Sequence, residues 1–120
     1  MQNSYTYRKL LVWQKSMSLV TEVYRSVKSF PQDELYVLTS QIKRSATSIP
    51  SNIAEGYGRD GTKDYLRFLN IALSSLFELQ TQLEIAYNLS FLKEENFNKL
   101  FLDKREIERM LTSFIRRIKG

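Results

Sequence analysis

The sequence predicts an all-α protein, an antiparallel up-and-down four-helix bundle built as one domain over residues 1–120. A chain of this length is typical of one domain. Apolar residues recur at steps of three and four in four separate segments, and no segment shows the sustained alternation of a strand. Because the connections between these segments are short, consecutive helices are expected to lie side by side and run in opposite directions.

The first predicted helix covers residues 8–29 and ends at Phe30-Pro31, because proline disfavours helical geometry in the residue before it. Its expected core seam is Leu10, Trp13, Met17, Val20, Tyr24 and Val27. A second apolar stripe on this helix, formed by Val12, Leu19 and Val23, points away from that seam.

The second predicted helix covers residues 34–57, with Leu35, Leu38, Ile42, Ile49 and Ile53 in its seam and small Ser45 and Ala46 between them. Pro50 predicts a kink, since proline removes one backbone donor and crowds the preceding turn. Gly56 or Gly58 is expected to end the helix in the left-handed conformation. These glycines also begin a G-x-G-x-x-G string, but a phosphate loop needs them to follow a strand, so we interpret them as a helix end.

The third predicted helix covers residues 62–88 and follows a turn at Asp60-Gly61, with Thr62 as its expected N-cap. Its seam is Tyr65, Leu69, Ala72, Leu76, Leu79, Leu83 and Ala86. The fourth predicted helix covers residues 94–119, with the seam Phe97, Leu100, Lys104, Ile107, Leu111, Phe114 and Ile118. Lys104 is expected to sit at the core edge and to extend its ammonium group to water.

More apolar surface is present than the four seams use. Leu66, Leu73 and Phe77 form a second stripe on the third helix, and Phe101 and Leu102 lie outside the core arc of the fourth. Such stripes predict a homo-oligomer, since soluble monomers rarely expose large apolar patches. The predicted oligomer contacts are Val12, Leu19, Val23, Leu66, Leu73 and Phe77. The alternative is a wide apolar face on each helix of a small bundle.

The net charge is +5, and the basic excess lies in the first and last quarters of the chain. At helical spacing, Arg105, Arg109, Arg116 and Lys119 share one side of the fourth helix, opposite its seam. The first and fourth helices of such a bundle are neighbours, which extends this surface. The predicted nucleic-acid-binding residues are Arg8, Lys9, Lys15, Arg105, Arg109, Arg116, Arg117 and Lys119. The alternatives are an ordinary solvated face or a site for an acidic protein.

Two absences from the composition narrow the chemistry. The chain has no cysteine and no histidine, which removes thiol nucleophiles, thiolate metal sites and the commonest general base. We therefore predict no catalytic residue, no metal and no cofactor, and a protein that is not an enzyme. The chain also has no signal-peptide pattern and no apolar run of about 20 residues, so a soluble cytoplasmic protein without a membrane contact is expected.

Three segments together resemble a known family: LLVWQKSMSLVTEVY (10–24), LTSQIKRSATSIPSNIAEGYGR (38–59) and DYLRFLNIALSSLFELQTQL (64–83). They are similar to the bacterial four-helix bundle proteins encoded in intervening sequences of 23S ribosomal RNA genes. The resemblance implies a left-handed bundle, assembly as a homopentamer, and no established catalytic residue. It also implies that Ser48, Pro50, Asn52, Glu55 and Gly56 serve architecture or subunit contacts.

The same family includes accessory factors of diversity-generating retroelements, in which a basic pentamer binds nucleic acid and a reverse transcriptase. The sequence and the resemblance together predict a non-enzymatic, oligomeric bundle that binds structured RNA or DNA through its basic surface. The alternative function is a protein-interaction scaffold, one that docks a reverse transcriptase or another protein partner.

Overall fold

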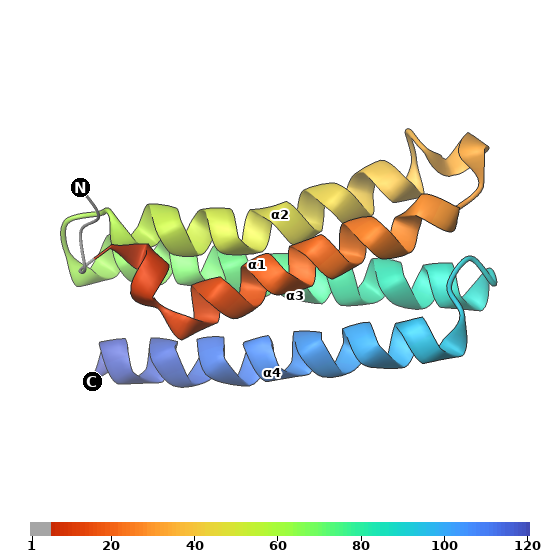
Figure 1. Ribbon diagram of the computed structural model, residues 1–120. Coiled ribbons are helices and arrows are strands. Elements are labelled where there is room, and N and C mark those ends of the chain that lie inside the picture. The colour runs from red at the N-terminus through yellow and green to blue at the C-terminus, as the bar shows by residue number, and fades with distance from the viewer. Residues whose placement is uncertain (1–5) are drawn as a thin grey trace.

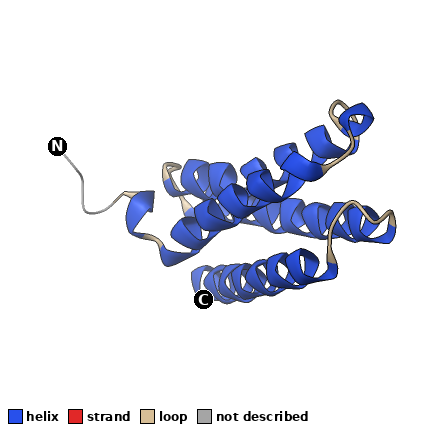
Figure 2. Cartoon of the chain, turned by 45° about the vertical axis from the view of Figure 1, so that its right-hand side comes forward, coloured by secondary structure: helices blue, strands red, loops and turns tan. Residues whose placement is uncertain are grey.

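The computed structural model describes residues 6–120. Its four α-helices are α1 (Leu11–Ser26), α2 (Leu38–Tyr57), α3 (Thr62–Asn88) and α4 (Glu94–Lys119). Three short 3-10 helices, Tyr7–Lys9, Val27–Ser29 and Gln32–Glu34, lie before and after α1. Over these residues there is no strand (Figure 2). The predicted class, an all-α four-helix bundle, is confirmed.

The four helices form a ring in which α1 packs against α2 and α4, and α3 packs against the same two helices. Figure 1 shows that the chain direction reverses at each connection, so the start of α1, the α2–α3 turn and the end of α4 gather at one end of the molecule. The α1–α2 and α3–α4 connections lie at the other end. The molecule measures 43 × 31 × 22 Å along its principal axes.

The two later helices occupy the predicted ranges 62–88 and 94–119, whereas the two earlier helices are shorter than the predicted 8–29 and 34–57. Leu10 has extended backbone angles, so α1 begins only at Leu11. Val37 is not helical either, with φ −118° and ψ −99°, and α2 begins at Leu38. A 3-10 helix precedes both α1 and α2. Its i,i+3 spacing also occurs in an α-helical pattern, so the sequence pattern alone extended both helices too far.

The core follows the predicted seams on α2, α3 and α4. Ile42, Ile49 and Ile53 of α2 are completely buried, as are Leu69 and Leu76 of α3. On α4 the buried apolar residues are Leu100, Ile107, Leu111 and Ile115. Ile115 was not in the predicted seam, and the predicted Phe97, Phe114 and Ile118 are only partly buried. Burial of each such side chain contributes about 1.5–3 kcal/mol, so these seams supply most of the driving force for folding.

On α1 the structure corrects the predicted core face. Val12, Leu19 and Val23, predicted as outward oligomer contacts, are 5%, 1% and 0% exposed and lie in the core. Met17 and Tyr24, predicted in the seam, are 43% and 39% exposed. The buried face also contains Ser16, which makes it look more polar in the sequence: the Ser16 hydroxyl donates to the Val12 carbonyl at 2.7 Å, which satisfies it without water.

Lys104 also differs from expectation, because its side chain does not extend to water. It is 2% exposed, and its ammonium group donates to Gln80 Oε1 on α3 and, at 2.9 Å, to Glu108 Oε1 on α4. The ammonium also lies 4.8 Å from the centre of the Phe101 ring. A buried charge is tolerated when it is paired and hydrogen-bonded, as here.

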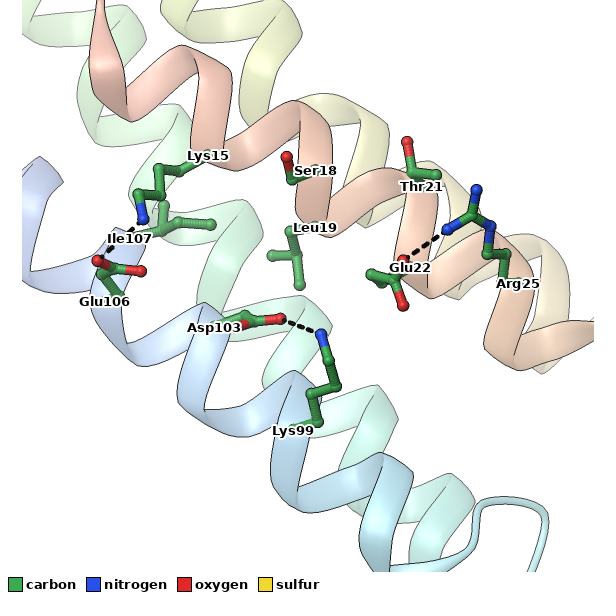
Figure 3. A pocket seen from close by; sticks show the side chains of 10 residues that line it. All are labelled: Lys15, Ser18, Leu19, Thr21, Glu22, Arg25, Lys99, Asp103, Glu106 and Ile107. Carbon is green, nitrogen blue, oxygen red and sulfur yellow. Dashed lines mark hydrogen bonds and ion pairs between the residues drawn. The ribbon is translucent and has the colours of Figure 1, made fainter.

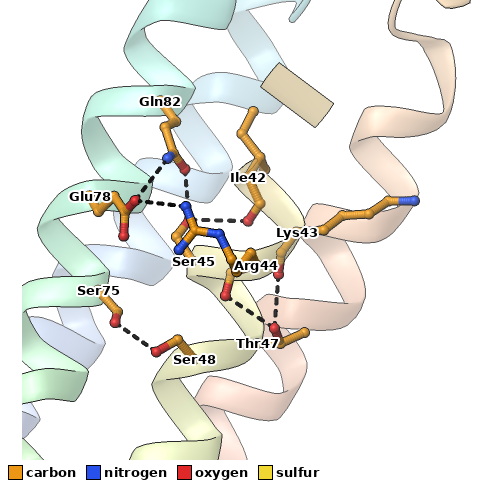
Figure 4. Close-up of polar contacts among 9 residues, drawn as sticks. All are labelled: Ile42, Lys43, Arg44, Ser45, Thr47, Ser48, Ser75, Glu78 and Gln82. Carbon is orange, nitrogen blue, oxygen red and sulfur yellow. Dashed lines mark hydrogen bonds and ion pairs between the residues drawn. The ribbon is translucent and has the colours of Figure 1, made fainter. Parts of the chain in front are cut away.

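Small and polar residues join α2 to α3. Ser45 Oγ donates to Gln82 Oε1 at 2.7 Å, and the hydroxyls of Ser48 and Ser75 are hydrogen-bonded at 2.8 Å (Figure 4). At the outer edge Arg44 Nη2 donates to Glu78 Oε2 at 3.3 Å. The serine side chains are short, so the two helices approach closely while their polar groups remain paired.

The α2–α3 turn places its glycines in different roles from those predicted. Neither Gly56 nor Gly58 has a positive φ, and it is Gly61, with φ 89°, that adopts the left-handed backbone before α3. Gly61 rather than Thr62 is the N-cap, and no side chain caps the helix. Gly56 instead serves close packing, since a Cβ there would lie 2.8 Å from Phe68 Cβ.

Candidate nucleic-acid interface

Basic residues gather at the end of the bundle where the start of α1 meets the end of α4. Arg8 and Lys9 lie in the 3-10 helix before α1, and Arg116, Arg117 and Lys119 lie in the last turn of α4. All five are exposed, and both elements lie at the same end of the molecule (Figure 1). The structure therefore brings together two groups that are about a hundred residues apart in sequence.

The opposite end of the bundle carries the opposite charge. Asp33 and Glu34 lie in the α1–α2 connection, and Glu94 and Glu95 lie in the first turn of α4. Lys28 and Lys93 are the cations at this end. The positive net charge of the chain is thus concentrated away from the α3–α4 connection.

The solvent face of α4 extends the basic surface along the bundle. Arg105, Arg109 and Arg116 are exposed, whereas the buried residues Ile107, Leu111 and Ile115 face the core. Within residues 6–120, none of these three arginines forms an ion pair. Their guanidinium groups are therefore available to an anion from outside the chain.

The acidic residues that could neutralise this face are engaged elsewhere. Glu106 pairs across the helices with Lys15 at 3.3 Å, and Glu108 pairs with the buried Lys104 at 2.9 Å. Lys15, predicted as part of the basic surface, is thus neutralised in the α1–α4 contact. Arg8 retains its charge and lies against two aromatic rings, 5.7 Å from the centre of Tyr7 and 5.8 Å from that of Trp13.

Three basic residues near the α2–α3 turn were not predicted. Arg59 pairs with Glu55 at 2.8 Å, and Arg67 lies 3.8 Å from Asp64. Lys63 is exposed and forms no ion pair among the residues that the structure describes. Asp60 of the same turn is also exposed and forms no ion pair among the described residues, so the α2–α3 turn adds no net charge to the basic end.

A groove of about 440 Å³ lies between the start of α1 and the second half of α4. Its apolar lining residues are Leu10, Leu11, Val12, Met110 and Phe114. Arg109 and Arg117 also line it, and neither forms an ion pair in the described part of the chain. We call this the arginine groove. It combines apolar surface with two cations.

A second hollow of about 440 Å³ lies further along the same two helices and has a different character. Three ion pairs cross or border it: Lys15–Glu106 at 3.3 Å, Arg25–Glu22 at 2.8 Å and Lys99–Asp103 at 3.3 Å (Figure 3). Each cation there has its own carboxylate. An anion gains much less from this hollow than from the arginine groove.

Tyr65 of α3 packs against the same end of α4, with its ring centre 5.7 Å from that of Phe114. Burial, with a smaller contribution from Tyr57, raises the pKa of Tyr65 to about 12. The Tyr65 hydroxyl is buried and has no hydrogen-bond partner in the described structure. It is therefore a neutral phenol at physiological pH and adds no negative charge beside the arginines.

Neither a metal site nor a membrane-spanning element is found among residues 6–120. No group of three acidic side chains there is arranged to hold a metal ion. None of the described helices has the length and apolarity that crossing a bilayer requires.

Comparison with known proteins identifies the family. Residues 8–113 match the 23S rRNA-intervening sequence protein family. The chain belongs to this family. A crystal structure of a protein of unknown function from the S23 ribosomal protein family of Bacteroides thetaiotaomicron VPI-5482 has the same fold, with a TM-score of 0.82 and 29% sequence identity. The alignment covers 88% of this chain and 98% of that one. No curated protein matches the chain.

The family match divides the basic surface. Arg8, Lys9, Arg105 and Arg109 lie inside residues 8–113, whereas Arg116, Arg117 and Lys119 lie beyond them. The last turn of α4 thus adds its three cations outside the part of the chain that the family match covers.

Proposed function

We propose that this member of the 23S rRNA-intervening sequence protein family is a non-enzymatic protein of the cytoplasm that binds structured nucleic acid through its basic surface. The observation that carries the proposal is the position of the charges on α4. Its arginines Arg105, Arg109 and Arg116 face solvent without a carboxylate, while Glu106 and Glu108 are paired with Lys15 and Lys104.

Phosphate groups are the anions that such a surface fits. The cations run along one face of α4 and continue to Arg8 and Lys9 at the end of the bundle, as a phosphate backbone requires. Binding of this kind releases counterions, so affinity falls steeply as salt concentration rises. Phosphate contacts set position and orientation but carry little sequence preference.

The test is a filter-binding titration of a structured RNA and a DNA hairpin at several salt concentrations. The variant carries Arg116→Ala and Arg117→Ala, and the matched control carries Lys28→Ala and Lys93→Ala at the other end of the bundle. Each lost phosphate contact lowers the slope of log affinity against log salt by about one. We expect the arginine variant to lose about two from this slope and the lysine control to match the wild type.

Equal slopes for the two variants would place binding elsewhere on the protein. If the wild-type protein binds neither the RNA nor the DNA hairpin at low salt, the proposed function is contradicted outright. All four substituted residues are exposed, so we expect both variants to fold. Circular dichroism of both variants checks this.

We also propose that the protein assembles as a homo-oligomer, for which the family resemblance implies five subunits. Exposed apolar side chains support self-association: Phe77 is 46% exposed, Met17 43% and Tyr24 39%. Of the six contacts predicted from the sequence, Phe77 remains exposed, and Leu66 and Leu73 are half-buried. Sedimentation is expected to find a multiple of 14.2 kDa, and a species of 14.2 kDa alone at micromolar concentration contradicts assembly.

A further inference from the structure

The arginine groove differs from the rest of the basic surface because it also offers apolar side chains. Phe114 and Met110 of α4 line it together with Leu10 and Leu11 at the start of α1. Leu11 is 57% exposed, so part of this apolar lining lies in water. A ligand that matches the groove must bring both apolar surface and negative charge.

We propose that the arginine groove holds one unpaired base of a nucleic acid, while the phosphates beside that base contact Arg109 and Arg117. This inference rests on the proposed function and specifies which form of nucleic acid the same surface prefers. A base has an apolar face that packs on aromatic and aliphatic side chains, and it is covalently joined to phosphates on both sides. A duplex buries its bases by stacking and cannot offer them to a groove.

The charges around the groove favour a nucleic acid over an acidic peptide. Arg109 and Arg117 are two members of a longer series that continues with Arg105, Arg116 and Lys119 on the same helix. A phosphate backbone carries a regular series of charges that follows such a helix beyond the groove. The neighbouring hollow lined by Lys15 and Glu106 has the same volume, about 440 Å³, but its cations are paired, so volume alone does not explain the choice of site.

The spacing of the two arginines along α4 also agrees with this ligand. Arg109 and Arg117 are eight residues apart on α4, or roughly 12 Å along the helix axis at about 1.5 Å per residue. Long guanidinium side chains at this separation can contact phosphates on either side of one nucleotide. Ser113 lies between them on the helix and lines the groove, and its small side chain leaves the space open.

The experiment measures fluorescence anisotropy with three labelled RNA duplexes of equal length. One is fully paired, one carries a single bulged adenosine, and one carries the same bulge without its base. Stacking of one base on protein side chains strengthens binding enough to predict a preference of roughly tenfold for the bulged adenosine over the other two probes.

The variant Ser113→Leu fills the groove without changing charge, and Thr112→Leu is the matched control, since Thr112 is exposed on the same helix and does not line the groove. We expect Ser113→Leu to remove the preference for the bulged adenosine while its affinity for the paired duplex and its salt slope stay unchanged. Thr112→Leu is expected to behave as the wild type. Leu11→Gln, at an exposed position, provides a second groove variant if Ser113→Leu does not fold.

The outcomes separate this inference from the proposed function. Equal affinity for all three duplexes overturns the base-binding groove while nucleic-acid binding stands. A preference for the bulged adenosine that persists in both groove variants overturns the groove as its site. Failure of every probe to bind at low salt overturns the groove, and it overturns the proposed function as well if the DNA hairpin also fails to bind.

Discussion

The contact between α2 and α3 contains small hydroxyl side chains, whereas the contact between α1 and α4 is bordered by a long charged pair. Ser45, Ser48 and Ser75 bring α2 and α3 close and form hydrogen bonds across the contact. Lys15 and Glu106 link α1 to α4 from side chains that are 41% and 47% exposed, and two hollows flank them. One contact therefore contributes rigidity, and the other leaves space that a ligand can use.

The largest expected effect follows from a methyl group at the closest approach of α2 and α3. Gly56→Ala places a Cβ 2.8 Å from Phe68 Cβ and 3.3 Å from the backbone oxygen of Tyr65, so one helix must shift. Overpacking of this kind costs about 1–3 kcal/mol, which exceeds the gain in helix propensity. Chemical denaturation should show the loss as a lower midpoint.

Gly58→Ala is the matched control for that substitution. Its added Cβ meets nothing nearer than 3.7 Å, and its φ of −82° suits alanine. We expect a gain of about 0.4–1 kcal/mol from the reduced entropy of the unfolded chain. Equal stability changes at the two positions would show that the α2–α3 contact tolerates expansion.

The next effect separates two fully buried serines. Ser45→Ala leaves the Gln82 Oε1 acceptor without its bond at 2.7 Å across the helices, at a cost of about 1–3 kcal/mol. Ser16→Ala removes only a bond to the Val12 carbonyl of its own helix, and we expect less than about 1 kcal/mol. Thermal denaturation of the two variants measures the difference, and a larger loss at Ser16 contradicts the importance of the cross-helix bond.

A pH-dependent effect is expected at Tyr65, where α3 meets the ends of α2 and α4. Its pKa is raised to about 12 from 10.0, so the folded state holds this proton more tightly than the unfolded state does. Its contribution to stability is therefore complete below pH 10 and declines as the pH rises towards 12.

Tyr65→Phe should remove that decline, and it should not destabilise the protein at neutral pH, because the hydroxyl has no partner. Tyr36→Phe, at a residue that is 89% exposed, serves as the control. Denaturation midpoints measured between neutral pH and pH 12 provide the comparison. An alkaline decline of the same size in wild type and Tyr65→Phe would contradict the assignment.

The smallest effect is expected in the contact between α1 and α4. A double-mutant cycle of Lys15→Ala and Glu106→Ala should give a coupling energy of less than about 1 kcal/mol, because both side chains are largely exposed. A coupling well above that range would show that α1 and α4 are held by this pair as firmly as α2 and α3 are by theirs.

The sequence was sufficient for most of the seams of α2, α3 and α4, because isoleucine and leucine there recur at every turn and outnumber the apolar residues on the other faces. It was not sufficient for α1, where two apolar stripes lie side by side. The stripe that contains Ser16 looks more polar than the one that contains Trp13, yet its hydroxyl is satisfied inside the helix. Periodicity measures apolar character and does not register such a bond.

The candidate interface could also be predicted only in part. The helical repeat alone places Arg105, Arg109 and Arg116 on one face of α4. Which cations remain unpaired depends on contacts between distant segments, such as Lys15 with Glu106 and Lys104 with Gln80. The arginine groove also requires the position of α1 beside α4, which no local pattern contains.

The separation of charge between the two ends of the bundle has a kinetic consequence. Five exposed cations lie at the end formed by the start of α1 and the end of α4, whereas four carboxylates and only two lysines lie at the other. In the field of a polyanion such a molecule experiences a torque that turns its positive tip forward before contact. Collisions then occur preferentially in the binding orientation, and the association rate rises as ionic strength falls.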